Sequence, residues 1–100
     1  ITAALVDIGA DLLARLGDLA GAVRLFAAAD RWRDGSARPE PERGRAEEVD
    51  RAARTVLTAR RYTAERSRGA TFATEDVLRE LSRTAAPSGT GGTGGTATGR

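Results

Sequence analysis

Hydrophobic residues in the first third of the chain recur at steps of three and four, which is the spacing of one face of an α-helix. The first run predicts a helix over residues 3–16. Its apolar positions are Leu5, Ile8, Leu12, Leu13 and Leu16. Its polar positions, which we expect to face water, are Asp7, Asp11 and Arg15. Gly17 then predicts the end of this helix, because glycine adopts a left-handed C-cap without strain, and Asp18 is suited to cap the next helix.

The second run predicts a helix over about residues 18–33 that is apolar along two stripes, so neighbouring helices should cover it from two sides. Gly35 is its expected C-cap. Pro39 and Pro41 exclude helix from the loop that follows and fix φ for the next start. A third, strongly charged helix is therefore expected over about residues 41–60.

The last elements are predicted with less detail. Residues 61–69 continue either as a short helix around Tyr62 or as an irregular turn. Residues 70–73 are expected to be extended, and Thr74 to act as the N-cap of a closing helix. From Pro87 onward Gly, Thr and Ser alternate without an apolar anchor, which is typical of a flexible linker or disordered tail.

The second predicted helix resembles the second helix of a tetratricopeptide (TPR) repeat, in which Gly, small and large apolar residues recur at fixed spacings. The residues that carry this signature are Gly17, Leu19, Ala22, Phe26 and Ala29. The resemblance implies an all-α fold built around a TPR-like helical hairpin of an α-solenoid. The alanines would let a second helix approach closely, and Phe26 would fill the gap between them.

Composition excludes several kinds of chemistry. The chain of 100 residues has no Cys and no His, so disulfides, thiolate zinc sites and the commonest general base are absent. All 16 basic residues are Arg, and 14 acidic residues leave a net charge of +2, which is weak support for nucleic-acid binding. No apolar run approaches membrane-spanning length, and no signal peptide is visible. Because the chain begins at Ile1, we expect it to be a fragment of a longer protein.

The order of motifs over about residues 5–82 resembles the C-terminal end of the helical-repeat region in actinobacterial SARP/AfsR-like and LuxR-type ATPase regulators. The matching pieces are Leu16-Gly17-Asp18, Ala22 to Ala29, Pro39, Glu42-Arg43, Arg54, Leu57, Tyr62, Gly69, Thr74-Glu75-Asp76 and Leu78. The resemblance implies a segment of a cytoplasmic signalling and transcription regulator whose DNA-binding and nucleotide-hydrolysing domains lie elsewhere. No motif residues for DNA binding or nucleotide hydrolysis are present in this chain.

The first helix offers a candidate partner surface at Leu5, Ile8 and Leu12. Its apolar residues spread over more than one face, and the second helix of a hairpin covers only part of them. In a repeat array the remainder is buried against the neighbouring unit. The expected partners are therefore neighbouring repeats of the same longer chain or another protein, and the isolated segment should self-associate.

A second candidate surface is basic. Arg60, Arg61, Arg66 and Arg68 cluster with only Glu65 opposing them. They could contact phosphates, but a solvated surface near a helix C-terminus, where cations suit the dipole, explains them as well. The third and last helices are too far apart for the tight turn of a helix-turn-helix, so nucleic acid is not expected to bind through this segment.

Other notable residues have structural explanations. Trp32 is expected in the core beneath the third helix, although it could anchor a partner. The adjacent carboxylates Glu47-Glu48 and Glu75-Asp76 point in different directions on a helix, so they do not converge on a substrate or metal. The glycines of residues 89–95 lack the Lys and the following helix of a phosphate-binding loop.

The sequence therefore predicts a TPR-like helical domain over residues 1–84, in which a hairpin is followed by a terminal capping helix pair, and a disordered Gly/Thr-rich tail over 85–100. We expect a non-enzymatic interaction scaffold with no catalytic residue, cofactor or metal. A small Arg-rich DNA-binding module is the first alternative. A hydrolytic enzyme fragment is the second, and it is disfavoured because His, Cys and any nucleophile arrangement are missing.

Overall fold

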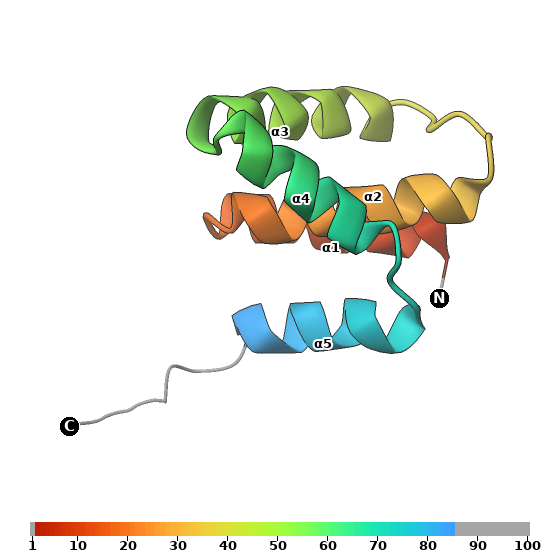
Figure 1. Ribbon diagram of the computed structural model, residues 1–100. Coiled ribbons are helices and arrows are strands. Elements are labelled where there is room, and N and C mark those ends of the chain that lie inside the picture. Colours follow the sequence, from red (N-terminus) through yellow and green to blue (C-terminus); the bar gives the residue numbers. More distant parts are fainter. Residues whose placement is uncertain (1, 86–100) are drawn as a thin grey trace.

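The computed structural model describes residues 2–85, and within them it contains helices and no strand (Figure 1). The helices are α1 (Ala3–Arg15), α2 (Leu19–Arg33), α3 (Glu42–Val56), α4 (Ala59–Gly69) and α5 (Thr74–Ala85). The all-α prediction is confirmed. Residue 1 and residues 86–100 lie outside the described residues, as do nearly all of the predicted tail and the glycine-rich residues 89–95.

The hairpin of α1 and α2 forms where the sequence places its signals. Gly17 has a φ of 91°, in the left-handed region that glycine tolerates, and it ends the first helix. Asp18 caps α2, because its side chain accepts a hydrogen bond of 2.8 Å from the backbone N–H of Gly21. Both boundary predictions are confirmed.

Helix α2 lies at the centre of the molecule. Residues 21–29 of this helix are all buried, and α2 contacts each of the other four helices. Figure 1 shows α3 above it, α5 below it and α4 crossing in front, with α1 packed behind. A helix that is small and apolar on nearly every side can be surrounded in this way, as its two predicted stripes indicate.

The core consists of two clusters that share α2. The main cluster joins α1, α2, α3 and α5, and the ring of Phe26 lies within it, only 7% exposed. Phe72 enters the same cluster from the α4–α5 connection, and Trp32 packs against it while staying partly exposed. The smaller cluster consists of Val23, Ala53 and Tyr62, so it joins α2 to α3 and α4.

The predicted third helix over residues 41–60 is wrong in extent. The backbone is extended at Leu57, with φ −89° and ψ 146°, so α3 ends at Val56. Thr58 then caps a new helix, α4, by accepting a hydrogen bond of 3.1 Å from the N–H of Arg61. Of the two alternatives for residues 61–69, the structure contains the helix. The break allows α4 to fold back across α2.

Three local details also differ. The C-cap of α2 is Asp34, at a φ of 50°, and Gly35 follows it in the left-handed region rather than being the cap itself. The chain turns at Ala70 and Thr71 instead of extending, because the N–H of Phe72 bonds back to the carbonyl of Gly69. Thr74 lies inside α5, and Asp76 supplies the capping carboxylate by accepting from the N–H of Ala73 at 2.9 Å.

Candidate interaction surfaces and charged clefts

The outer face of α1 is an exposed apolar surface. Leu5, Ile8 and Leu12 are 53%, 60% and 49% exposed, and Leu16 at the end of the helix is exposed as well. The opposite face of α1 is buried against α2 through Val6, Ala10, and Leu13. The hairpin therefore covers one side of α1 and leaves the other side uncovered by the described part of the chain.

Helix α5 packs beside α1 and has an exposed apolar side chain of its own. A Cβ added at Gly9 would lie 3.0 Å from Cδ2 of Leu81, so α5 packs against α1 at a glycine that leaves room for it. Leu78 lies three residues before Leu81 and hence on the same side of α5, and it is exposed. We define the α1 ridge as Leu5, Ile8, Leu12 and Leu16, and Leu78 lies on the neighbouring helix.

The TPR-like signature residues have structural roles in the hairpin. Ala22, Phe26 and Ala29 are buried in the main core, Leu19 packs partly buried against the smaller cluster, and Gly17 forms the turn. All five therefore act in packing or in the turn within this chain.

The four arginines of the predicted basic patch do not form one surface. Arg66 turns toward α2, where it pairs with Asp30 at 3.1 Å. Arg61 pairs with Glu65 at 2.6 Å on the other flank of α4. Arg60 and Arg68 have no ion-pair partner among residues 2–85. Arg66 and Arg68 line different clefts: Arg66 lies with Arg38, Arg43 and Arg51, and Arg68 lies with Arg79 and Arg83 of α5.

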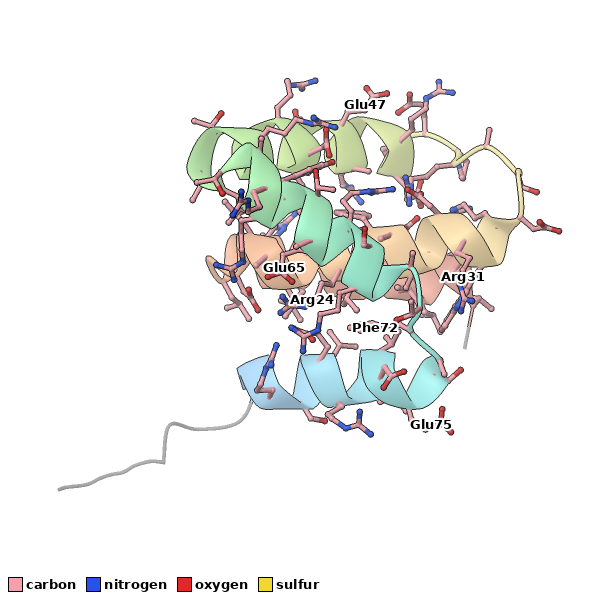
Figure 2. All side chains as sticks on the ribbon, viewed as in Figure 1. Arg24, Arg31, Glu47, Glu65, Phe72 and Glu75 are labelled. Carbon is pink, nitrogen blue, oxygen red and sulfur yellow. The ribbon has the colours of Figure 1, made fainter. Side chains whose placement is uncertain are left out.

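A buried ionic network that the sequence did not predict joins α2, α4 and α5 at Arg24. Its guanidinium is 4% exposed and donates to Glu65 of α4 at 2.6 Å and to Glu80 of α5 at 2.5 Å. Arg61 and Arg83 pair with the two glutamates from the outside. Figure 2 shows Arg24 in the seam between α4 and α5, with Glu65 above it. The signal in the sequence is that Arg24 is the one charged residue in the small and apolar stretch 19–29 of α2.

The network fixes the ionisation of Glu65. Burial opposes the charged form of this carboxyl, but hydrogen bonds from Arg61 and Arg24 outweigh burial and lower its pKa below the ordinary value. Charge-assisted hydrogen bonds of this kind hold the two helices in one register. The Nε of Arg24 is buried and has no hydrogen-bond partner within the described residues, so the network is not fully satisfied.

A second charged cluster corrects the prediction for Asp7. This residue was expected to face water, but it is 3% exposed and pairs with Arg33 and Arg38. Arg38 also donates to Asp30 at 2.7 Å and lies over the ring of Phe26 at 5.2 Å from its centroid. The loop after α2 therefore folds back over α1, which helix periodicity cannot reveal.

Tyr62 connects α3 to α4 through a polar contact at the edge of the smaller core. Its hydroxyl donates to Asp50, and Arg54 lies over its ring at 4.3 Å from the centroid. Burial and this hydrogen bond raise the pKa of Tyr62. Burial opposes ionisation of Asp50 as well, but hydrogen bonds from Tyr62 and Arg54 lower the pKa of its carboxyl overall.

Two clefts of similar size open on the surface of the described residues. The first, of about 310 Å³, lies among α2, α3 and α4 and has an apolar floor of Val23, Phe26, Ala46 and Val49. Glu47 and Arg51 at this cleft have no ion-pair partner in the described range. The second, of about 290 Å³, lies between the end of α4 and α5. Its lining residues are Arg68, Thr71, Phe72, Asp76, Arg79, Glu80 and Arg83.

The carboxylate pairs of the sequence do not come together into a metal site. Figure 2 shows Glu47 on α3 and Glu75 on the far side of α5, well apart. Within residues 2–85 there is no group of three or more acidic side chains that could hold a metal ion. Over the same residues no helix has both the length and the apolar character needed to cross a membrane.

Comparisons with protein families, curated proteins and solved structures found no significant match to this chain. The surfaces described above are therefore the basis for the functional proposal.

Proposed function

We propose that this chain is a non-enzymatic interaction segment in a signalling or transcription regulator of the cytoplasm. In this proposal the α1–α2 hairpin is the last unit of a TPR-like helical array, and α3, α4 and α5 close that array. The observation that supports it is the α1 ridge, where four large apolar side chains at helical spacing stay exposed. Exposed apolar surface of this kind marks interaction sites.

The occupant of the α1 ridge is a helix of a neighbouring hairpin. Steps of three and four residues along the ridge match the rows into which a second helix packs. Gly9, beside the ridge, already accepts the side chain of Leu81, so α5 supplies an adjacent apolar edge at Leu78. When no neighbouring hairpin is present, a second copy of the chain takes its place.

Sedimentation equilibrium of the 100-residue chain tests this proposal. We expect reversible self-association, which Ile8→Gln with Leu12→Gln should abolish while helix content and melting temperature stay close to those of the unchanged protein. Val56→Gln is the matched control, because Val56 is also exposed but lies alone on α3. A protein that stays monomeric, and gains no stability from an added upstream hairpin, would refute the proposal.

The sequence-based alternative, a small Arg-rich DNA-binding module, has weaker support. It requires a continuous basic surface. Arg66 pairs with Asp30 on one side of α4, whereas Arg61 pairs with Glu65 on the other. The predicted patch is divided between two flanks of the helix.

A further inference from the structure

We propose that the second cleft, between the end of α4 and α5, binds a phosphate group. Its walls carry Arg68 from α4 and Arg79 and Arg83 from α5. Guanidinium groups match phosphate oxygens in geometry and bind them through paired hydrogen bonds. Arg68 is the only one of the three without an ion-pair partner in residues 2–85, so its donors remain available for an anion.

The carboxylates in this cleft are already neutralised by protein groups. Asp76 accepts from the N–H of Ala73 at 2.9 Å and pairs with Arg79 at 3.0 Å. These contacts lower the pKa of Asp76, the backbone hydrogen bond being the larger cause. Glu80 is shared between Arg24, which is buried, and Arg83. Glu80 therefore has an interior partner in Arg24, and Asp76 accepts a backbone hydrogen bond in addition to its pair with the exposed Arg79.

The second cleft carries an excess of positive charge. Among its lining residues Arg68, Arg79 and Arg83 oppose Asp76 and Glu80, which leaves one unbalanced positive charge. A phosphate group carries one or two negative charges near neutral pH. The excess at the second cleft is therefore opposite in sign to the charge of the proposed ligand.

The lining of the first cleft also has one more arginine than carboxylate, since Arg38, Arg43, Arg51 and Arg66 accompany Asp30, Glu47 and Asp50, but this cleft differs from the second in two ways. At its mouth the unpartnered Arg51 is accompanied by the unpartnered Glu47, so an anion would meet both signs of charge. Its floor is apolar, whereas the second cleft has Phe72 as its one large apolar side chain. Figure 2 shows Phe72 in the seam between α4 and α5. For these two reasons we place the phosphate in the second cleft and not in the first.

A phosphate could come from a free phosphorylated compound or from a nucleic-acid backbone. The test therefore titrates the 100-residue chain separately with pyrophosphate and with a short duplex DNA at low salt, and follows backbone and arginine side-chain NMR signals. We expect pyrophosphate to shift the signals of Arg68, Arg79 and Arg83. Arg68→Gln and Arg79→Gln should each weaken binding about tenfold, as loss of a charge-assisted hydrogen bond does.

Arg60→Gln is the matched control, because it removes the same charge from α4 at a residue outside the cleft. Binding of pyrophosphate that the control retains supports a free phosphorylated ligand. Binding of duplex DNA alone, with the same dependence on Arg68 and Arg79, supports a nucleic-acid backbone as the source of the phosphate. Absence of binding to both probes, or an equal loss in the Arg60→Gln variant, overturns the proposal.

Discussion

Gly69 of α4 lies directly against the backbone of Arg24 in α2. A Cβ at residue 69 would lie 2.6 Å from the Cα of Arg24 and would overlap its carbonyl oxygen. The glycine thus sets how closely α4 crosses α2. It also places Glu65, one turn earlier on α4, over the side chain of the same arginine.

We expect Gly69→Ala to destabilise the protein by about 1–3 kcal/mol, because the added methyl group meets backbone that cannot rotate away. Urea denaturation followed by circular dichroism measures this change. The matched control is Gly44→Ala, whose Cβ would meet only the flexible end of Glu40 at 3.3 Å. That variant should change stability by less than about 0.5 kcal/mol, since the gain of alanine over glycine is offset by crowding of the Glu40 carboxylate that accepts from the N–H of residue 44. Equal effects of the two substitutions would contradict the close crossing.

Phe26→Ala should cost about 3–5 kcal/mol, because its buried ring lies in the main core and the surroundings cannot collapse fully into the cavity. In a domain of this size that is a large share of the total stability. Thermal melts compare it with Val56→Ala, which removes an exposed side chain and should change stability by less than about 0.5 kcal/mol. A Phe26→Ala melt within error of the unchanged protein would refute the assigned core.

Arg24→Leu should destabilise the protein by about 3–5 kcal/mol, because it leaves Glu65 and Glu80 buried without their shared partner. A triple variant, Arg24→Leu with Glu65→Leu and Glu80→Leu, should recover most of that loss, since it removes all three buried charges and leaves Arg61 and Arg83 exposed to water. Urea titrations of both variants make the comparison. If the single variant is as stable as the triple variant, the two glutamates are not held by Arg24.

The lowered pKa of Glu65 makes stability depend on pH. The unfolded chain has a Glu pKa of about 4.3 and therefore binds more protons near pH 4 than the folded state does. The stabilisation is fully present above that pH and is lost as the pH falls through the folded value. Melting temperatures between pH 6 and pH 3 should show this loss, and Glu65→Gln should make the decline shallower. A Glu65→Gln variant with an unchanged decline would show that other carboxyls, such as Asp50, account for it.

The sequence predicted structural features that are set by residues close together in the chain, and it missed features that are set by residues far apart in the chain. Gly17 and Asp18 were assigned correctly because the turn and the cap involve residues within the same turn of backbone. The break at Leu57 was missed because helix-forming residues lie on both sides of it and Thr58 is a weak signal within a charged run.

The buried charges could not be placed from local patterns. The partners of Arg24 lie 41 and 56 residues further along the chain, so their identity depends on where α4 and α5 dock. Asp7 occupies a polar position of α1, and it is paired with Arg33 at the end of α2 and with Arg38 in the loop that returns over α1. The exposure of Leu5, Ile8 and Leu12, by contrast, was expected, because the apolar residues of this helix spread over more than one face and the second helix of a hairpin covers only part of them.

The central position of α2 has a consequence for amide hydrogen exchange. The N–H groups of residues 22–29 are surrounded by all the other helices, so they can exchange with deuterium only when the whole domain opens. Helix α5 touches α1 and α2 along a narrow strip and is tied to the interior through Glu80. Its amides should exchange through a local opening that leaves the rest folded. Hydrogen exchange would then give two free energies of opening, a smaller one for α5 and a larger one for the whole domain.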